Sequence, residues 1–195
     1  MGRPRVLQSF IDHLEAALRP RVIHGSVEQE LVSAVFRTLS RPARTATDAK
    51  GRSRPSRDLL HAALQKARAS NADLASLATA FEELEPHLRW IGGSREMGPN
   101  DPIDLHSIIV GPSGLEPRKD AEIGVSLLAP YCEYVDHHHP PAEVYLILSP
   151  GQWRRSKDPW FEPGIGGIVY NQPHIIHNMK ASKVPLFAFW VLPGS

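Results

Sequence analysis

Three consecutive histidines and a nearby glutamate are the side chains of this sequence best suited to bind a metal. They lie in the segment His137-His138-His139-Pro140-Pro141-Ala142-Glu143-Val144-Tyr145. Because successive side chains of a strand point to opposite faces, the odd-numbered polar residues can share one face, which would gather His137, His139, Glu143 and Tyr145. His138 is expected to face away. Imidazole and carboxylate suit Zn, Fe or Mn, and a further ligand would come from elsewhere, with His177 or His174 as candidates.

These histidines could also have no functional role. A histidine in a strand is often a structural or surface residue, and a run of histidines can be a loop with incidental metal affinity. The HXH pair followed by Glu143 and a later His177 favours a divalent metal site over both alternatives. His174 stays open between the pocket and the surface. The other histidines are expected to be structural: His13, His24, His61, His87 and His106.

The scaffold that must position these residues changes character near Pro86. Of the 18 prolines and 14 glycines, only four and three respectively lie before residue 86. Apolar residues in that first part recur at helical spacing, in runs that begin at Phe10, Leu31, Leu59 and Leu74. The expected N-caps of the last three are Ser26, Ser56 and Asn71. Three or four amphipathic helices are therefore predicted.

Beyond Pro86 the apolar runs become short, rich in β-branched residues and separated by glycine or proline turns. Five of them are predicted to be strands: 106–110, 123–128, 143–148, 167–170 and 186–192. No helix-length segments intervene, so the pattern favours an all-β sandwich or barrel over βαβ units. We predict a mainly β fold, with a helical extension over residues 1–86 and a β-barrel carrying the metal site over residues 87–195.

The composition of the 195-residue chain indicates a small-molecule partner. Its 22 Lys and Arg balance 21 Asp and Glu, and a net charge of +1 gives no field for nucleic acid or an anionic membrane. The basic stretch 37–57 is expected to be a solvated loop. Cys132 is the single cysteine, and no signal peptide or membrane-spanning run stands out, so we expect a soluble cytoplasmic protein. The oligomeric state is left open.

At the histidine-rich segment the chain resembles the cupins. The first cupin motif, G(X)5HXH(X)3-4E(X)6G, is matched at His137, His139, Glu143 and, one residue late, Gly151. The second motif, G(X)5PXG(X)2H(X)3N, is matched at Gly167, Pro173 and His177. Its inner glycine is absent, one residue is missing before the histidine, and the terminal asparagine is not at its spacing. The resemblance implies a jelly-roll-like barrel, the double-stranded β-helix.

More of the chain resembles the dimethylsulfoniopropionate lyases of the DddQ type, which are cupins with an N-terminal helical part. The resemblance is carried by residues 131–145, Tyr-Cys-Glu-Tyr-Val-Asp-His-His-His-Pro-Pro-Ala-Glu-Val-Tyr, and by His174-Ile-Ile-His177. It implies β-elimination of this sulfonium carboxylate to dimethyl sulfide and acrylate, with one zinc, iron or manganese ion. The implied ligands are His139, Glu143, Tyr145 and His177. The implied base is Tyr134, with His137 beside the metal and a lower-ranked ligand candidate.

Two carboxylates compete with Tyr134 as the base. Glu133 should point to the opposite face, whereas Asp136 could be turned inward by the histidine-rich loop. A tyrosine serves only if a nearby cation favours its phenolate. The positive sulfonium could lie against an aromatic face, for which four residues are available: Trp153, Trp160, Tyr170 and Trp190.

Two other functions fit the same ligands. Another metal cupin enzyme, a dioxygenase or an isomerase, would combine them with a different pocket, and oxygen uptake with Fe(II) would indicate it. A non-catalytic cupin that binds a small ligand would show full metal occupancy without turnover. A fold shared by unrelated chemistries does not choose between them.

Overall fold

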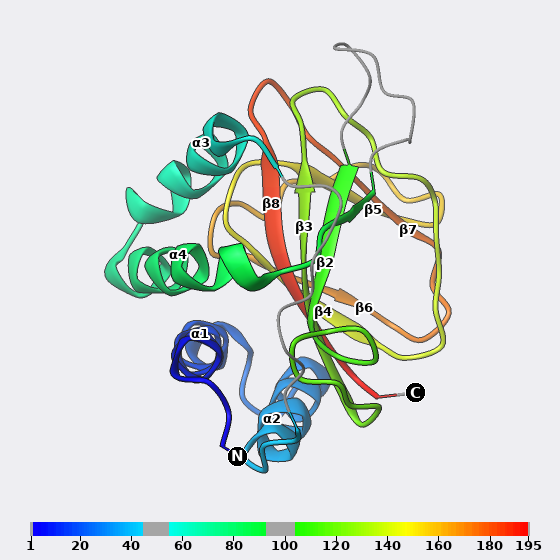
Figure 1. The fold of residues 1–195 in the computed structure, drawn as a ribbon. Helices are drawn as coiled ribbons and strands as arrows, with labels where there is room; N and C mark the ends of the chain where they lie inside the picture. Colours follow the sequence, from blue (N-terminus) through cyan, green and yellow to red (C-terminus); the bar gives the residue numbers. More distant parts are fainter. Residues whose placement is uncertain (1, 45–54, 93–103, 195) are drawn as a thin grey trace.

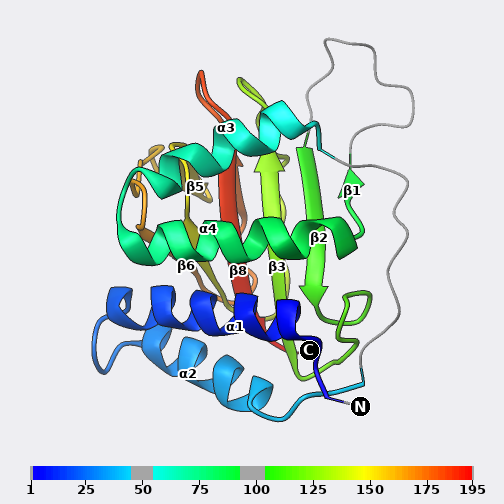
Figure 2. The same ribbon diagram turned by 60° about the vertical axis from the view of Figure 1, so that its left-hand side comes forward.

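Four helices cover one face of a six-stranded antiparallel sheet in the computed structural model, which describes residues 2–44, 55–92 and 104–194 (Figure 1 and Figure 2). The helices are α1 (Arg5–Leu18), α2 (Val27–Leu39), α3 (Arg57–Arg68) and α4 (Ala72–Leu84). A short 3-10 turn, η1 (Arg19–Arg21), follows α1. No helix in these described segments is long and apolar enough to cross a membrane.

Three of the helices begin at the N-cap residues that the sequence predicts. The side-chain oxygens of Ser26, Ser56 and Asn71 accept the backbone N–H three positions on, at 3.2, 3.2 and 3.1 Å. Each bond satisfies an amide that a helix start would otherwise leave unpaired. After α4, Pro86 lies in the 3-10 turn η2 (Glu85–His87), as suits a residue without an amide hydrogen.

The strands of the described residues form two sheets that enclose the interior of a barrel. The larger has the order β1-β2-β3-β8-β4-β6, and the smaller pairs β5 with β7. Their bounds are β1 (Ile91–Gly92), β2 (Asp104–Val110), β3 (Ala121–Leu128), β4 (Glu143–Ile147), β5 (Gln152–Arg155), β6 (Ile168–Asn171), β7 (His177–Lys180) and β8 (Leu186–Pro193). Side chains of both sheets form one buried cluster, which includes Tyr145, Trp153, Met179 and Trp190.

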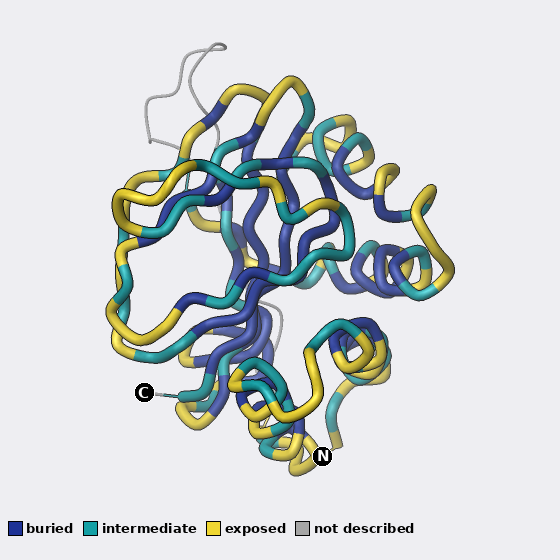
Figure 3. The backbone as a smooth tube through the Cα atoms, turned by 180° about the vertical axis from the view of Figure 1, so that it is seen from behind, coloured by how far each residue is buried: buried dark blue, intermediate teal, exposed yellow. Residues whose placement is uncertain are grey.

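Strand β8 separates two hydrophobic cores because its side chains alternate between the faces of the sheet. Phe189 points toward the helices, where Phe10 and Phe81 each lie with ring centroids 5.1 Å from it. Ala188 and Trp190 point into the barrel. Seen from behind, the sheet is buried along most of its strands and the outer loops are exposed (Figure 3). The helices therefore seal the outer face of the sheet and leave its inner face for a site.

The five strands predicted from apolar runs are present as β2, β3, β4, β6 and β8, with ends shifted by at most two residues. β1, β5 and β7 were not predicted. The sequences of β5 and β7, Gln-Trp-Arg-Arg and His-Asn-Met-Lys, contain one large apolar residue each and form no apolar run.

In the basic stretch, residues 45–54 lie outside the described part. The division at residues 86 and 87 stays a prediction, and helices and sheet share one hydrophobic cluster.

Candidate metal centre

Three side chains from separate segments meet inside the barrel. His139 belongs to the connection between β3 and β4, Glu143 begins β4, and His177 begins β7. One ligand atom of each lies within 4.8 Å of the others. Glu143 Oε2 stands 3.4 Å from His139 Nε2 and 3.3 Å from His177 Nε2. Two imidazoles and a carboxylate so arranged can hold a divalent metal. These three residues are called the ligand group below.

Hydrogen bonds on the far side of both imidazoles determine which nitrogen faces the group. His139 Nδ1 lies 2.8 Å from the carbonyl oxygen of Pro141, and His177 Nδ1 lies 2.9 Å from that of Ile175. A carbonyl only accepts, so each Nδ1 carries the hydrogen and each Nε2 can present a lone pair toward Glu143. His177 Nε2 is buried and has no hydrogen-bond partner among the described residues. Lone pairs that converge on a buried carboxylate fit a bound cation.

The charge of Glu143 is stabilised by its surroundings. Burial by itself raises the pKa of this carboxyl, but the imidazoles of His139 and His177, 3.4 and 3.3 Å away, hold it at about 2. Glu143 in turn raises the pKa of the His139 imidazole against the effect of burial. Asn171 of β6 donates a further hydrogen bond of 3.2 Å to Glu143 Oε2. Glu143 is therefore anionic at neutral pH, as a metal ligand must be.

The structure brings the other histidines of the motifs to different places. The His137 ring centroid lies 4.0 Å from that of His177, but His137 is not part of the ligand group. Burial, followed by the charge of His177, lowers the pKa of His137. His138 is exposed, as its parity predicts. His174 is also exposed, with a φ of 62°, and its amide donates to the carbonyl of His139 at 2.9 Å. It supports the ligand loop through its main chain.

One assumption of the sequence analysis is wrong, because His137 and His139 do not lie on the strand of Glu143. β4 begins at Glu143, and the histidines belong to an irregular connection. Pro140 and Pro141 lack the amides that a strand ladder needs, so the strand cannot extend back through them. Alternation does hold within β4, where Glu143 and Tyr145 line a cavity while Val144 packs on the helix side.

A cavity of about 270 Å³ opens beside the ligand group. Part of its wall comes from the histidine-rich segment and β4, through Tyr134, His137, His139, Pro140, Pro141, Glu143 and Tyr145. The remainder comes mainly from β2, β3 and β8, through His106, Glu122, Ser126, Met179 of β7, Trp190 and Leu192. Two members of the ligand group, His139 and Glu143, thus face a space that a small molecule can enter.

Both tyrosines named from the sequence line this cavity. Tyr145 is buried, and burial together with the charge of Glu143 raises its pKa well above the ordinary value. Tyr134 is half-buried, with its ring edge-on to His137 at a centroid distance of 4.9 Å. Burial and the charges of Asp104 and Glu143 raise the pKa of Tyr134 as well. Both are neutral phenols at neutral pH unless a cation is close by.

The two carboxylates that compete with Tyr134 lie outside the cavity lining. Glu133 is exposed and accepts a hydrogen bond of 3.2 Å from Asn178. Asp136 is exposed as well, and accepts hydrogen bonds from Asn178 at 2.8 Å and from Arg154 at 3.1 Å. These bonds lower the pKa of Asp136 and hold it on the outer surface. The histidine-rich loop does not turn it inward.

Of the four aromatic residues considered for the sulfonium, Trp190 lines the cavity. Trp153 is buried in the barrel core, and Tyr170 packs with the helix-side cluster. The ring of Trp160 is covered by two cations of the chain itself, with Lys180 Nζ 4.1 Å and Arg154 Cζ 4.7 Å from its centroid.

The sequence analysis missed three polar residues of the cavity: His106, Glu122 and Ser126. His106 was expected to be structural. Glu122 and Ser126 alternate with apolar residues along β3, and this pattern marks the polar side of a strand. It could have identified the wall, but not that the wall faces the ligand group.

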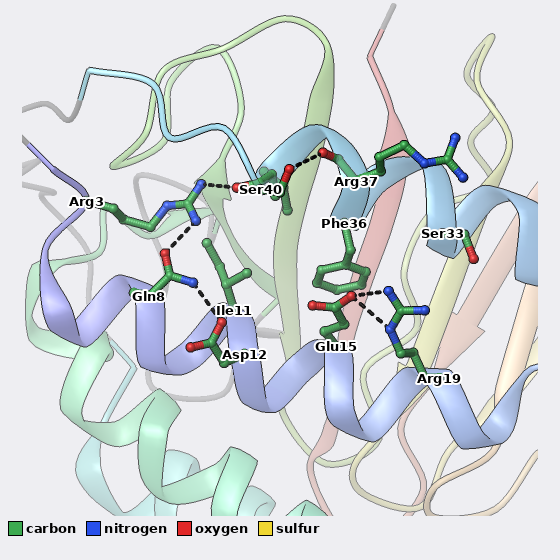
Figure 4. A pocket seen from close by; sticks show the side chains of 11 residues that line it. Arg3, Gln8, Ile11, Asp12, Glu15, Arg19, Ser33, Phe36, Arg37 and Ser40 are labelled. Atoms are coloured by element: carbon green, nitrogen blue, oxygen red, sulfur yellow. Dashed lines mark hydrogen bonds and ion pairs between the residues drawn. The ribbon is translucent and has the colours of Figure 1, made fainter.

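A second hollow, of about 530 Å³, lies between α1 and α2 on the other side of the sheet (Figure 4). Its polar side chains largely bond to one another. Gln8 accepts from Arg3 at 2.7 Å and donates to Asp12 at 2.7 Å, and Arg19 pairs with Glu15. The ligand group and the tyrosines are absent from its lining, so the barrel cavity is the better candidate site.

Comparisons with known proteins identify the family of this chain. The sequence pattern of the dimethylsulfoniopropionate lyase family matches residues 27–188. The lyase DddQ from Ruegeria pomeroyi DSS-3 is 17% identical, with a TM-score of 0.67 over 99% of this chain and 93% of that one. A chain from the structures of the lyases RdDddP and RnDddQII is 18% identical, with a TM-score of 0.65 over 97% and 93%. No curated protein sequence matches the chain.

The structural likeness, at identities this low, shows the shared fold. The predicted architecture, N-terminal helices followed by an antiparallel β-barrel, is confirmed. The family match goes further, because it spans most of the chain, over residues 27–188. This chain is therefore a lyase and belongs to the dimethylsulfoniopropionate lyase family.

Proposed function

We propose that this protein cleaves dimethylsulfoniopropionate by a metal-dependent β-elimination to dimethyl sulfide and acrylate. One observation carries the proposal: two members of the ligand group, His139 and Glu143, line the same cavity of about 270 Å³ as Tyr134 and Tyr145. Membership of the lyase family supplies the substrate class. A concave site with a few convergent polar groups is the usual setting for such chemistry.

His139, Glu143 and His177 are the proposed ligands, with Tyr145 as a fourth. A divalent zinc, iron or manganese ion held there would act as a Lewis acid toward the substrate carboxylate. Tyr145 is suited to its role because it lines the cavity beside Glu143 and its pKa responds to the charge of that carboxylate. An incoming carboxylate can displace such a phenol and leave the two histidines and Glu143 in place.

Tyr134 is the proposed base. As a phenolate, favoured by a bound cation, its oxygen would take the proton from the carbon next to the substrate carboxylate, and the electrons of that C–H bond would form the carbon–carbon double bond. The electrons of the C–S bond leave with sulfur as neutral dimethyl sulfide, so no acid is needed for the leaving group. His137 lies edge-on to Tyr134 and donates from Nδ1 to the Val135 carbonyl at 3.0 Å. Its unprotonated Nε2 gives Tyr134 a basic neighbour.

Trp190 is the proposed aromatic surface for the sulfonium, because its indole lines the cavity. A cation against such a face gains about 1 kcal/mol or more when desolvated.

The function is tested by incubating the protein with dimethylsulfoniopropionate and measuring dimethyl sulfide in the headspace, with zinc, iron or manganese added in turn. We expect dimethyl sulfide and acrylate in equal amounts with at least one metal. Stoichiometric binding of all three metals without dimethyl sulfide would contradict the proposal. Oxygen consumption under the same conditions would indicate a dioxygenase instead.

A further inference from the structure

Two carboxylates lie in one row across the inner face of the large sheet. Glu122 of β3 pairs with Leu192 of β8, and the register of β8 with β4 continues from Val144 opposite Val191 to place Glu143 opposite Leu192. All three residues of the row, Glu122, Leu192 and Glu143, line the cavity. Neighbouring strands are about 4.8 Å apart, so the backbones that carry the two carboxylates are separated by about 10 Å.

The carboxylates differ in how their charge is matched. Glu143 has two imidazoles and an asparagine amide beside it. The carboxylate of Glu122 has no hydrogen bond or ion pair with any described residue, and the residue of the row between the two carboxylates is the apolar Leu192. The side chain of Glu122 lies against Gly111, where an added Cβ would come within 2.7 Å of its Cγ. Glu122 therefore occupies the far end of the row.

A metal ligand and a structural ion pair are both poor descriptions of Glu122. Its carboxylate is not among the ligand atoms that lie within 4.8 Å of one another. It is close enough for electrostatic coupling, since burial and then the charge of Glu143 raise the pKa of Glu122, while His139 has a smaller lowering effect. Glu122 is a second, partly buried anion in the wall of a small cavity. A positive charge on the substrate is the best counter-charge for it.

We propose that Glu122 is a specificity residue that selects substrates with a permanent positive charge at the end opposite their carboxylate. The substrate would lie along the row, with its carboxylate at the ligand group and its onium end at Glu122. This inference rests on the proposed function for the orientation of the substrate. It extends that function by naming the side chain that distinguishes short ω-onium carboxylates from carboxylates of the same shape with an uncharged end.

The neighbouring row supports the same arrangement. Trp190 pairs with Gly124, and the indole reaches across to lie against Gly124, two residues along β3 from Glu122 and on the same face. An onium group beside Glu122 would therefore meet an aromatic surface and an anion together. Both interactions favour a desolvated cation, and neither favours an uncharged group.

The test uses two ligands that do not undergo elimination of a sulfide and differ in charge but not in shape. They are 3-(trimethylammonio)propionate and 4,4-dimethylpentanoate, and their binding to the zinc-loaded protein is measured by calorimetry. We expect the unaltered protein to prefer the cationic ligand. Glu122→Gln should lower the affinity for the cationic ligand by about 10- to 100-fold and leave the affinity for 4,4-dimethylpentanoate nearly unchanged. Glu122→Asp, which keeps the charge with a shorter reach, should retain part of the preference.

Glu162→Gln is the matched control, since Glu162 is exposed and bonds to Gln152 outside the cavity. It should leave both affinities unchanged. The inference would be overturned if Glu122→Gln lost affinity for both ligands equally, or if it kept the preference for the cationic ligand. A variant with native affinities and a reduced kcat would overturn it too, because Glu122 would then be a base. A charge preference that disappears in Glu122→Gln supports the inference even if no dimethyl sulfide forms, so the two proposals can fail separately.

Discussion

The main chains of His137 and His177 pair with each other: His177 donates its amide to the carbonyl of His137 at 2.9 Å, and His137 donates in return at 3.2 Å. This pair ties the histidine-rich connection to the start of β7. It brings His139 and His177 together although they are far apart in the sequence. Since the main chain sets this register, the ligand group is formed by the protein fold itself.

The base assignment is tested by Tyr134→Phe, which removes the hydroxyl and keeps the ring. We expect native metal content and substrate affinity, with kcat lower by about 10²- to 10⁴-fold, as is typical of a lost general base. Glu133→Gln and Asp136→Asn are controls, because both carboxylates lie outside the cavity lining. A near-native kcat in Tyr134→Phe would refute the assignment, and a large loss in either control would move the role to that carboxylate.

Tyr145→Phe should alter turnover more than folding. The phenol is buried and coupled electrostatically to Glu143, so removing its hydroxyl affects the ligand group first. We expect a native circular dichroism spectrum, weaker metal retention during dialysis and a changed kcat/KM. Native values of all three would make Tyr145 a packed residue of β4 and remove it from the site.

Gly124→Ala should displace the indole of Trp190. A Cβ at Gly124 would lie 2.0 Å from one indole carbon and 2.4 Å from the next. Because the indole is rigid, the whole ring must move to relieve this clash. Overpacking of this kind costs about 1 to 3 kcal/mol, and the ring should also narrow the cavity. Urea denaturation of Gly124→Ala, Trp190→Phe and the double variant forms a cycle. We expect the smaller ring to restore part of the stability; strictly additive losses would show that the two residues do not interact.

Glu116 links the N-terminus to the loop between β2 and β3. Its buried carboxylate accepts hydrogen bonds from Arg3 Nε at 2.5 Å, Arg118 Nη1 at 2.8 Å and the Ala43 amide at 3.1 Å. Burial by itself raises its pKa, but the hydrogen bonds and the charge of Arg3 bring it below the ordinary value of 4.5. Removing one partner from such a cluster costs about 3 to 5 kcal/mol, so Glu116→Gln should lower the free energy of unfolding markedly.

The same carboxylate predicts a pH dependence. A pKa that is lower in the folded than in the unfolded state gives stability that is full above the unfolded value and lost as pH falls toward the folded one. The difference in unfolding free energy between the protein and Glu116→Gln should therefore shrink as pH decreases below about 4.5. Urea denaturation at neutral and acidic pH measures it, and a constant difference would be inconsistent with a lowered pKa.

The parts of this fold that follow from local chemistry could be predicted from sequence. Ser26, Ser56 and Asn71 cap helices because their side chains reach amides three residues on, and apolar runs such as 186–192 mark strands buried on both faces. The histidine and glutamate types of the ligand group were likewise recognisable. Their convergence was inferred from parity, although the histidines lie in a proline-interrupted connection.

What depends on pairing between distant strands could not be predicted. Glu122 becomes a cavity residue because β3 lies one strand away from β4 across β8, an order that no local pattern encodes. Asp136 faces outward because Asn178 of β7 and Arg154 of β5 hold it there, and neither strand forms an apolar run. His106 enters the cavity for a similar reason, since β2 adds to the sheet beside β3.

The dependence of turnover on the ligand group is measured most directly by the rate of dimethyl sulfide release as a function of bound metal per chain. Metal-free protein is titrated with zinc, iron or manganese, and bound metal is determined by elemental analysis of the same samples. We expect the rate to rise in proportion to occupancy and to level off at about one ion per chain. His139→Ala, Glu143→Ala and His177→Ala should each lose metal and turnover together, while the exposed His138→Ala keeps both. Dimethyl sulfide release that is independent of bound metal, or unchanged metal content in all three ligand variants, would contradict a metal-dependent lyase at this site.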